Sequence, residues 1–284
     1  MERRPKAERL AAERIGLVAG SGRFPVLFAE TARRRGVEVV AVAHLGETDP
    51  ALERVVSAIT WIHPGELDAM IHALQTAGIR RTVMVGGIAK PRLFRELRPD
   101  ERATRLLARL DKLRDDLVLR ALAAEFETEG IAVVESTLYL QEIVPVAGVL
   151  GTRAPSEEEW SEIRFGFRAA KVIGQFDIGQ SVVVRSGAVI AVEGIEGTDA
   201  TIRRAGQLAN GDIVVVKVCK PTQDTRFDLP AVGPETVRTL AEMRGRALAV
   251  EAGRTITLDR SEMIALADAA GIAVVAVAPA EVPT

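Results

Sequence analysis

Apolar runs of strand length alternate with helical stretches through the first half of this chain. The predicted strands cover residues 15–19, 37–43, 82–85 and 131–134. The predicted helices cover residues 26–35, 64–77, 103–113 and 117–129. Parallel strands need a crossover connection, which is usually a helix, so this alternation predicts a parallel, Rossmann-like sheet.

The second half lacks that clean alternation. Residues 181–185 with 188–193, and 247–251 with 255–258, are predicted hairpins, while helices are expected after Ser156 and Gly197. A length of 284 residues favours two domains. We therefore predict an α/β protein with a polar leader at 1–13. The Rossmann-like N-terminal domain would span 1–150, and a mixed α/β catalytic domain would span 151–284.

Charge and cysteine content limit the partners and the compartment. The net charge of −2 and the lack of a basic patch with aromatics argue against a nucleic-acid partner. A single cysteine, Cys219, excludes an internal disulfide and is typical of a reducing compartment. The charged N-terminus is unlike a signal peptide, and no apolar run reaches membrane-spanning length. We expect a cytoplasmic protein, with peripheral membrane contact left open.

The polar stretch at residues 217–233 carries the most suggestive chemistry. Prolines bracket it, which excludes a long helix or a central strand. Asp224, Arg226 and Asp228 share one face if the chain is extended, and the two carboxylates are also neighbours in a helical turn. Carboxylates beside a guanidinium suit Mg²⁺ or Mn²⁺ next to a phosphate. The alternative is a solvated loop whose charges pair locally.

Two glycine-rich turns follow predicted strands. They contain Gly20, Ser21 and Gly22, and Gly86, Gly87 and Lys90. Such turns can present backbone N–H groups to a phosphate, and Lys90 could reach one, although plain tight turns are the alternative. Pro25 replaces the third glycine of a dinucleotide fingerprint, and His44 stands where a ribose-binding acid is expected, so NAD is disfavoured.

Glu193, Glu196 and Asp199 lie within seven residues of one another, between a predicted strand and a helix. Three carboxylates next to glycines exceed what helix capping by Thr198 or Asp199 requires. This group is therefore a second candidate for ligand contacts.

Taken in order, these motifs resemble those of the LpxI-type UDP-2,3-diacylglucosamine pyrophosphatases of lipid A biosynthesis. The resemblance begins at Ile15 and covers nearly the whole chain. It rests on residues 16–22 with Pro25, 86–91, Asp116 with 125–130, 177–180, 191–199 with Arg203 and Arg204, and 217–233.

The resemblance implies hydrolysis of UDP-2,3-diacylglucosamine to UMP and 2,3-diacylglucosamine 1-phosphate (lipid X). It also implies a divalent metal, Mg²⁺ or Mn²⁺, and two domains flanking a substrate chamber. Asp228 matches the family's essential aspartate, and Asp224 stands where the family also accepts glutamate. Both are expected to be catalytic metal ligands, with Arg226 and Lys220 as further catalytic residues. The expected substrate-binding residues are Gly20, Ser21, Gly22, Gly86, Gly87, Lys90, Gln180, Thr198, Asp199, Lys217 and Gln223.

The expected partners follow from the same resemblance. They are UDP-2,3-diacylglucosamine and lipid X, with transient contact with the cytoplasmic face of the inner membrane and a homodimer as one option. Two other classes compete with the hydrolase. One is a non-catalytic carrier of a nucleotide-sugar or lipid X, and the other is a nicotinamide-dependent enzyme.

Overall fold

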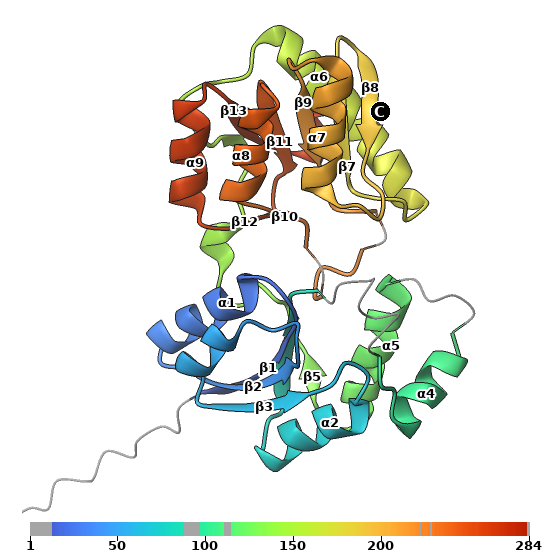
Figure 1. Ribbon diagram of the computed structural model, residues 1–284. Helices are drawn as coiled ribbons and strands as arrows, with labels where there is room; N and C mark the ends of the chain where they lie inside the picture. The colour runs from blue at the N-terminus through green and yellow to red at the C-terminus, as the bar shows by residue number, and fades with distance from the viewer. Residues whose placement is uncertain (1–12, 88–96, 111–114, 222, 228, 283–284) are drawn as a thin grey trace, which may run out of the picture. The chain divides into compact units, whose positions relative to one another are not determined.

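The computed structural model describes residues 13–87, 97–110, 115–221, 223–227 and 229–282, apart from the side chains of residues 115 and 116. Within this part, the chain divides into two compact units (Figure 1). The first extends to Leu140 and also takes in Arg226 and Phe227. The second comprises Gln141–Thr225 and the chain from Leu229 onward.

The first unit is built on a five-stranded sheet. Its elements are β1 (Arg14–Ala19), α1 (Phe24–Arg34), β2 (Glu38–His44), the 3₁₀ helix η1 (Pro50–Arg54), β3 (Ala58–Ile62), α2 (Leu67–Thr76), β4 (Arg81–Val85), α4 (Glu101–Ala108), α5 (Asp115–Thr128) and β5 (Ala132–Val133). The strand order is β3-β2-β1-β4-β5, and every pairing is parallel. The predicted Rossmann-like parallel sheet is confirmed.

Helices cover both faces of this sheet. Val18, Val42 and Met84 pack with buried side chains of α2, α4 and α5 on one face, and α1 lies on the other (Figure 1). The chain enters α1 through Pro25, whose fixed φ suits the first helical turn.

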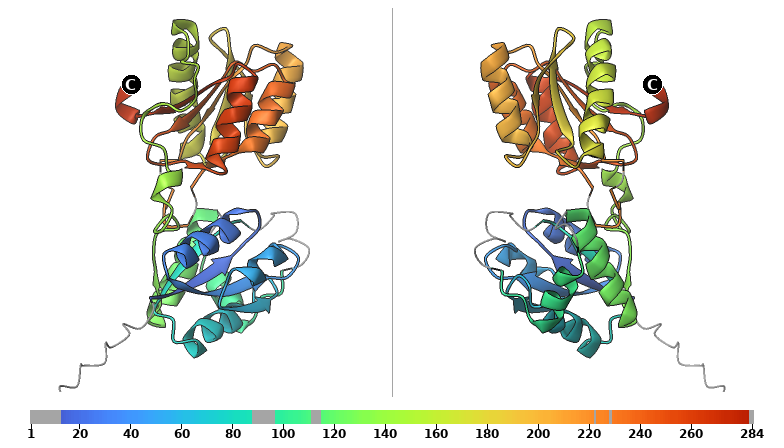
Figure 2. Two further views of the ribbon diagram at one scale, coloured as in Figure 1. Left: turned by 90° about the vertical axis from the view of Figure 1, so that its left-hand side faces the viewer. Right: turned by 90° about the vertical axis from the view of Figure 1, so that its right-hand side faces the viewer.

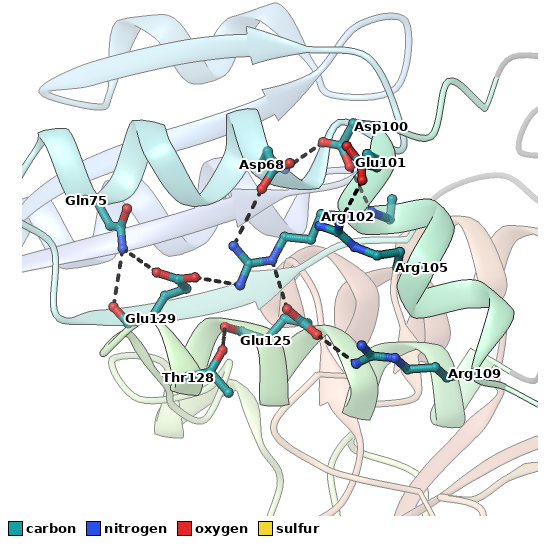
Figure 3. Close-up of polar contacts among 11 residues, drawn as sticks. Asp68, Gln75, Asp100, Glu101, Arg102, Arg105, Arg109, Glu125, Thr128 and Glu129 are labelled. Atoms are coloured by element: carbon teal, nitrogen blue, oxygen red, sulfur yellow. Dashed lines mark hydrogen bonds and ion pairs between the residues drawn. The ribbon is translucent and has the colours of Figure 1, made fainter.

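Arg102 connects the helices on the first of these faces (Figure 3). Its guanidinium donates to Glu125 on α5 at 2.8 Å and to Glu129 at 2.7 Å, and lies 3.5 Å from Asp68 on α2. Desolvation opposes the charge of Arg102, but the hydrogen bonds to Glu129 and Glu125 outweigh it and raise the pKa of the guanidinium. This fork joins α2, α4 and α5.

Two predictions for the first unit need correction. Strand β3 was not predicted, because half-buried and exposed residues alternate along this edge strand without a fully apolar run. Helix α2 begins at Leu67 and not near Pro64, because residues 64–66 form a turn in which Glu66 accepts a hydrogen bond from the His63 amide at 2.6 Å.

The second unit is built on a six-stranded mixed sheet. Its elements are the 3₁₀ helix η2 (Gln141–Ile143), β6 (Gly148–Val149), α6 (Glu157–Gln175), β7 (Ser181–Arg185), β8 (Ala188–Val192), α7 (Thr198–Ala209), β9 (Val214–Lys217), β10 (Ala231–Val232), α8 (Pro234–Glu242), β11 (Ala247–Glu251), β12 (Ile256–Thr257), α9 (Arg260–Ala269), β13 (Ala273–Val277) and the 3₁₀ helix η3 (Pro279–Glu281). The strand order is β6-β13-β11-β9-β7-β8, and β10 pairs with β12 separately. The predicted mixed α/β fold is confirmed.

Alternate residues of the central strands face different helices. Val214 and Val216 pack with Ile163 and Phe167 of α6, whereas Val215 packs in the cluster that contains α7, α8 and α9. Helix α6 therefore lies on one face of the sheet and the other three helices on the opposite face (Figure 2). Strands buried on both faces are typical of a parallel sheet covered by helices. In the described ranges, no helix combines the length and apolar character needed to cross a membrane.

Local signals in this half were confirmed in part. The hairpin of β7 and β8 is antiparallel as predicted, and α6 is the helix expected after Ser156, which forms a capping box with Glu159. The second predicted hairpin is wrong, because β11 pairs in parallel with β9 and β13, while β12 pairs with β10. Asp259 occupies the N-cap position of α9, where it adopts a left-handed conformation and makes no side-chain capping bond.

Candidate active site

The carboxyl ends of β9 and β11 form one edge of the second sheet. Since β7 runs antiparallel to β9, Ser181 at the start of β7 pairs with Lys217 at the end of β9. The end of β8 pairs in turn with β7, which brings Glu193 to the same edge. Open α/β sheets bind ligands at the carboxyl ends of their parallel strands.

A chain of hydrogen bonds connects the predicted binding residues at this edge. The Lys217 ammonium, with only 6% of the residue exposed, donates to the Thr198 hydroxyl oxygen at 2.8 Å and to the Ala231 carbonyl at 2.9 Å. The Thr198 hydroxyl donates to one carboxylate oxygen of Glu193 at 2.7 Å. The backbone N–H of Gln180 donates to the other carboxylate oxygen at 3.3 Å. The fold therefore brings Gln180, Thr198 and Lys217 together around Glu193.

Three side-chain oxygens near these groups are buried without a hydrogen-bond partner in the described part of the protein. They belong to Gln180 (Oε1), Ser181 (Oγ) and Asp199 (Oδ1). Buried acceptors are normally satisfied, so each can still take a hydrogen bond from a water or a ligand. Asp199 lies in the first turn of α7, and the N-cap position there belongs to Gly197.

The loop after β9 is held by side chains at its start. The Lys220 ammonium donates to the Asp177 carboxylate at 2.7 Å, with both side chains mostly buried. Gln223 accepts from the Lys220 amide at 3.0 Å, and the half-buried Asp224 follows it directly. Lys220, Gln223 and Asp224 thus belong to one supported loop at this edge.

The chain then turns and joins the first unit. Residues 225–227 form a turn, so the single-face arrangement expected of an extended segment is not found. Phe227 is buried in the core cluster of the first unit. Arg226 lies 3.3 Å from Glu127, and its guanidinium carbon is 4.7 Å from the centre of the Phe227 ring. Thr222 and Asp228 lie outside the described residues.

The two glycine turns of the first unit meet at the carboxyl ends of β1 and β4. Ser21 donates its amide to the Gly87 carbonyl at 2.7 Å and its hydroxyl to the same oxygen at 2.8 Å. A Cβ on Gly20 would lie 2.5 Å from that oxygen, and Gly86 has a φ of +85°. The backbones approach too closely for larger residues. Gly22 also has a positive φ, and Lys90 lies outside the described part.

His44 contacts Ala19, the residue that directly precedes the first of these turns. Its Nδ1–H donates to the Ala19 carbonyl at 2.9 Å, and Thr48 donates to the same oxygen at 2.6 Å. Burial lowers the pKa of His44, while the bond to Ala19 and the charge of Glu47 oppose the shift. His44 is therefore a neutral structural residue.

The predicted divalent metal can be compared with the oxygen donors at the edge of the second sheet. No three His, Cys, Asp or Glu side chains gather as metal ligands among the residues that the structure describes. Asp224 supplies a carboxylate, and Asp199 and Gln180 supply the unpartnered oxygens. Hard oxygen donors of this kind suit Mg²⁺ or Mn²⁺, so the donor chemistry fits the predicted ion.

Sequence reasoning missed the charged residues that hold the candidate loop. Glu251 ends β11 and Lys171 lies on α6, and both contact the backbone of Cys219. Asp177, quoted only as part of a motif, pairs with Lys220. A carboxylate at the end of an otherwise apolar, fully buried strand was the available signal for Glu251.

Comparisons with known proteins match both halves of the chain to one family. Residues 14–143 match the model of the LpxI N-terminal domain, and residues 146–275 match that of the LpxI C-terminal domain. A curated relative, "UDP-2,3-diacylglucosamine pyrophosphatase LpxI" of Caulobacter vibrioides (strain ATCC 19089 / CIP 103742 / CB 15), is 34% identical over 281 residues, which cover 95% of this chain and 99% of the relative.

Solved structures give much weaker likenesses. The biotin carboxylase subunit of pyruvate carboxylase is 13% identical, with a TM-score of 0.27, over 70% of this chain and 42% of that one. The biotin carboxylase domain of 2-oxoglutarate carboxylase from Hydrogenobacter thermophilus is 13% identical, with a TM-score of 0.28 and the same two coverages. Scores this low say nothing about the present chain. The two domain matches, together with the relative that aligns over nearly the whole length of both chains, place this chain in the LpxI family.

Proposed function

We propose that this protein hydrolyses the pyrophosphate bond of UDP-2,3-diacylglucosamine, giving UMP and 2,3-diacylglucosamine 1-phosphate (lipid X) for lipid A biosynthesis. The observation that carries the proposal is the match to both LpxI domains, together with an end-to-end relative named for this activity. Two ammonium groups at the edge of the second sheet support the proposal, the buried Lys217 and the Lys220 that is paired with Asp177.

We assign Asp228 and Asp224 to hold Mg²⁺ or Mn²⁺, which would supply charge neutralisation for the pyrophosphate oxygens when bound. Lys217, Lys220 and Arg226 are assigned to stabilise negative charge on the leaving phosphate. The Lys217 ammonium is held by Thr198 and Ala231, so its charge needs little reorganisation during the reaction. The glycine turns and Lys90 are assigned to phosphate binding.

We place the reaction at the cytoplasmic face of the inner membrane. The substrate and lipid X each carry two acyl chains, and such molecules partition into bilayers. Brief contact with the membrane surface would therefore deliver the substrate and accept the product. Flotation with vesicles that contain lipid X tests this, and equal recovery with vesicles that lack it would argue against product-dependent contact.

The test of the reaction uses the purified protein with UDP-2,3-diacylglucosamine in ¹⁸O-labelled water. Parallel samples contain Mg²⁺, Mn²⁺ or EDTA, and products are read by mass spectrometry. The expected result is UMP and lipid X in the metal samples only. The labelled product then identifies which phosphorus water attacks. Substrate that binds but stays intact under every metal would overturn the hydrolase and favour a carrier.

A further inference from the structure

A buried ion pair clamps one peptide group where the candidate loop leaves the sheet. Glu251, at the end of β11, is 1% exposed, and its Oε2 lies 2.6 Å from the ammonium of Lys171 on α6. The same Oε2 accepts the Cys219 amide N–H at 2.8 Å. Lys171 donates to the Cys219 carbonyl at 2.7 Å. One ion pair therefore grips Cys219 by both its N–H and its C=O.

Stability alone does not explain a pair of this kind. Removing two charges from water costs much of the attraction gained, and apolar replacements of similar volume are often equally stable. What an apolar pair cannot supply is a donor and an acceptor at fixed positions beside the Cys219 backbone. The distinctive contribution of Glu251 and Lys171 is thus the geometry of that backbone.

The clamp acts next to the proposed catalytic loop. Cys219 precedes Lys220, whose ammonium is paired with Asp177 and whose amide is held by Gln223. Helix α6 packs closely against the same segment, since a Cβ on Gly174 would lie 3.3 Å from the Lys220 Cα. A shift of Cys219 would therefore move the backbone of Lys220.

We infer that Glu251 and Lys171 are positioning residues for the hydrolysis, acting through the Cys219 peptide on Lys220 and the loop that follows. This inference rests on the proposed function, because Lys220 is a catalytic assignment of that proposal. Neither residue is assigned to contact the substrate or a metal.

The central test is the double variant Lys171→Met with Glu251→Leu. It removes both charges, so neither charge is left buried without its partner. A retained Tm shows that it folds. We expect kcat to fall by about 10- to 100-fold with KM within about twofold, since small misplacements of catalytic groups cost rate more than binding. Hydrogen exchange, measured without substrate, should rise about tenfold or more in the peptide that begins at Val218.

A matched control is Arg246→Met with Glu162→Leu. This pair, 3.5 Å apart, joins the first turns of α6 to the start of β11 and should leave kcat and the exchange of that peptide unchanged. Glu251→Gln is a second, isosteric variant that keeps an acceptor for the Cys219 amide. We expect a smaller fall in kcat from it.

The outcomes separate two kinds of failure. Normal turnover and unchanged exchange in the double variant would overturn the positioning role while the hydrolase stands. A wild-type protein without turnover would overturn the proposed function and the catalytic meaning of the clamp. In that case the exchange measurement still reports whether the pair holds the Cys219 backbone.

Discussion

Lys217 and Thr198 meet through their side chains at 2.8 Å, although they come from the end of β9 and the start of α7. Lysine can only donate, so the Thr198 oxygen accepts from it and the hydroxyl hydrogen is directed to Glu193 at 2.7 Å. The contact fixes the direction of both hydrogen bonds. It also holds a buried ammonium against the first turn of the helix.

Thr198→Val should therefore reduce both stability and turnover. The change keeps the shape of the side chain but removes an acceptor from Lys217 and a donor from Glu193, which should cost about 1–3 kcal/mol in the free energy of unfolding. Urea unfolding and kcat/KM measure the two effects. Thr198→Ser keeps the hydroxyl and is the control. A valine variant as stable and active as wild type would show that this hydrogen-bond chain is dispensable.

Asp228→Asn should lower kcat by about a thousandfold or more while leaving substrate affinity nearly unchanged, because the lost carboxylate is assigned to the reaction and not to uniform binding. Single-turnover kinetics measure the rate of the chemical step, and equilibrium binding measures the substrate affinity separately. Asp224→Glu keeps a carboxylate and should retain much more activity than Asp224→Asn. Near-normal turnover by Asp228→Asn, or loss of substrate binding, would refute the assignment.

The parallel sheet of the first unit could be predicted because its buried strands alternate with helical stretches that carry their own start and stop signals. Pro25 at the first helical turn is an example. The edge strand β3 gives no comparable signal, since only one of its five residues is fully buried. Strand β11 was located but wrongly paired, because apolar periodicity does not specify which strands lie beside it.

The candidate site shows the same division. Lys217 and Lys220 could be selected because polar residues cluster after a buried strand, and Gln223 could be selected through the family resemblance. Their contacts with Thr198 and Asp177 depend on how distant strands pair, and no local pattern encodes that. The sequence also did not predict that Arg226 and Phe227 belong to the first unit, because Phe227 is a single apolar residue in a polar stretch.

Gly20→Ala should destabilise the first unit, whereas Gly87→Ala should not. A Cβ at Gly20 would lie 2.5 Å from the Gly87 carbonyl oxygen, and both atoms belong to turns with little room to shift. A Cβ at Gly87 would meet nothing within 4 Å. We expect a loss of about 1–3 kcal/mol in the free energy of unfolding for Gly20→Ala alone, measured in urea. Equal stabilities would show that the two turns separate readily.

Arg102→Met should lower the thermal stability of the first unit, because Glu125 and Glu129 lose the guanidinium that donates to both, and Glu125 is left with Arg109 at 3.9 Å. Arg102→Lys should recover only part of the loss, since an ammonium cannot reproduce the forked donors of a guanidinium. Thermal unfolding at low and high salt measures both. Arg105→Met is the control, because its pair with Glu101 is exposed. Identical stabilities for the Arg102 and Arg105 variants would contradict the role of the fork.

His44 should make the first unit less stable as the solution becomes mildly acidic. Burial lowers its pKa in the folded protein below the usual value of 6.5. The unfolded chain therefore begins to take up a proton near pH 6.5, where the folded protein still resists it. The contribution is fully present above about pH 6.5 and is lost as pH falls from there through the lowered pKa.

His44→Asn tests this, because an asparagine amide can replace the Nδ1–H donor to Ala19 without titrating. Unfolding free energies between about pH 8 and 5 should fall more steeply for wild type than for the variant below about pH 6.5. The slope below that pH reports the extra proton bound by the unfolded chain. Thr48, which shares the Ala19 acceptor, does not titrate and cannot produce the difference. Parallel curves for the two proteins would mean that His44 takes up its proton equally well in the folded state, despite its burial.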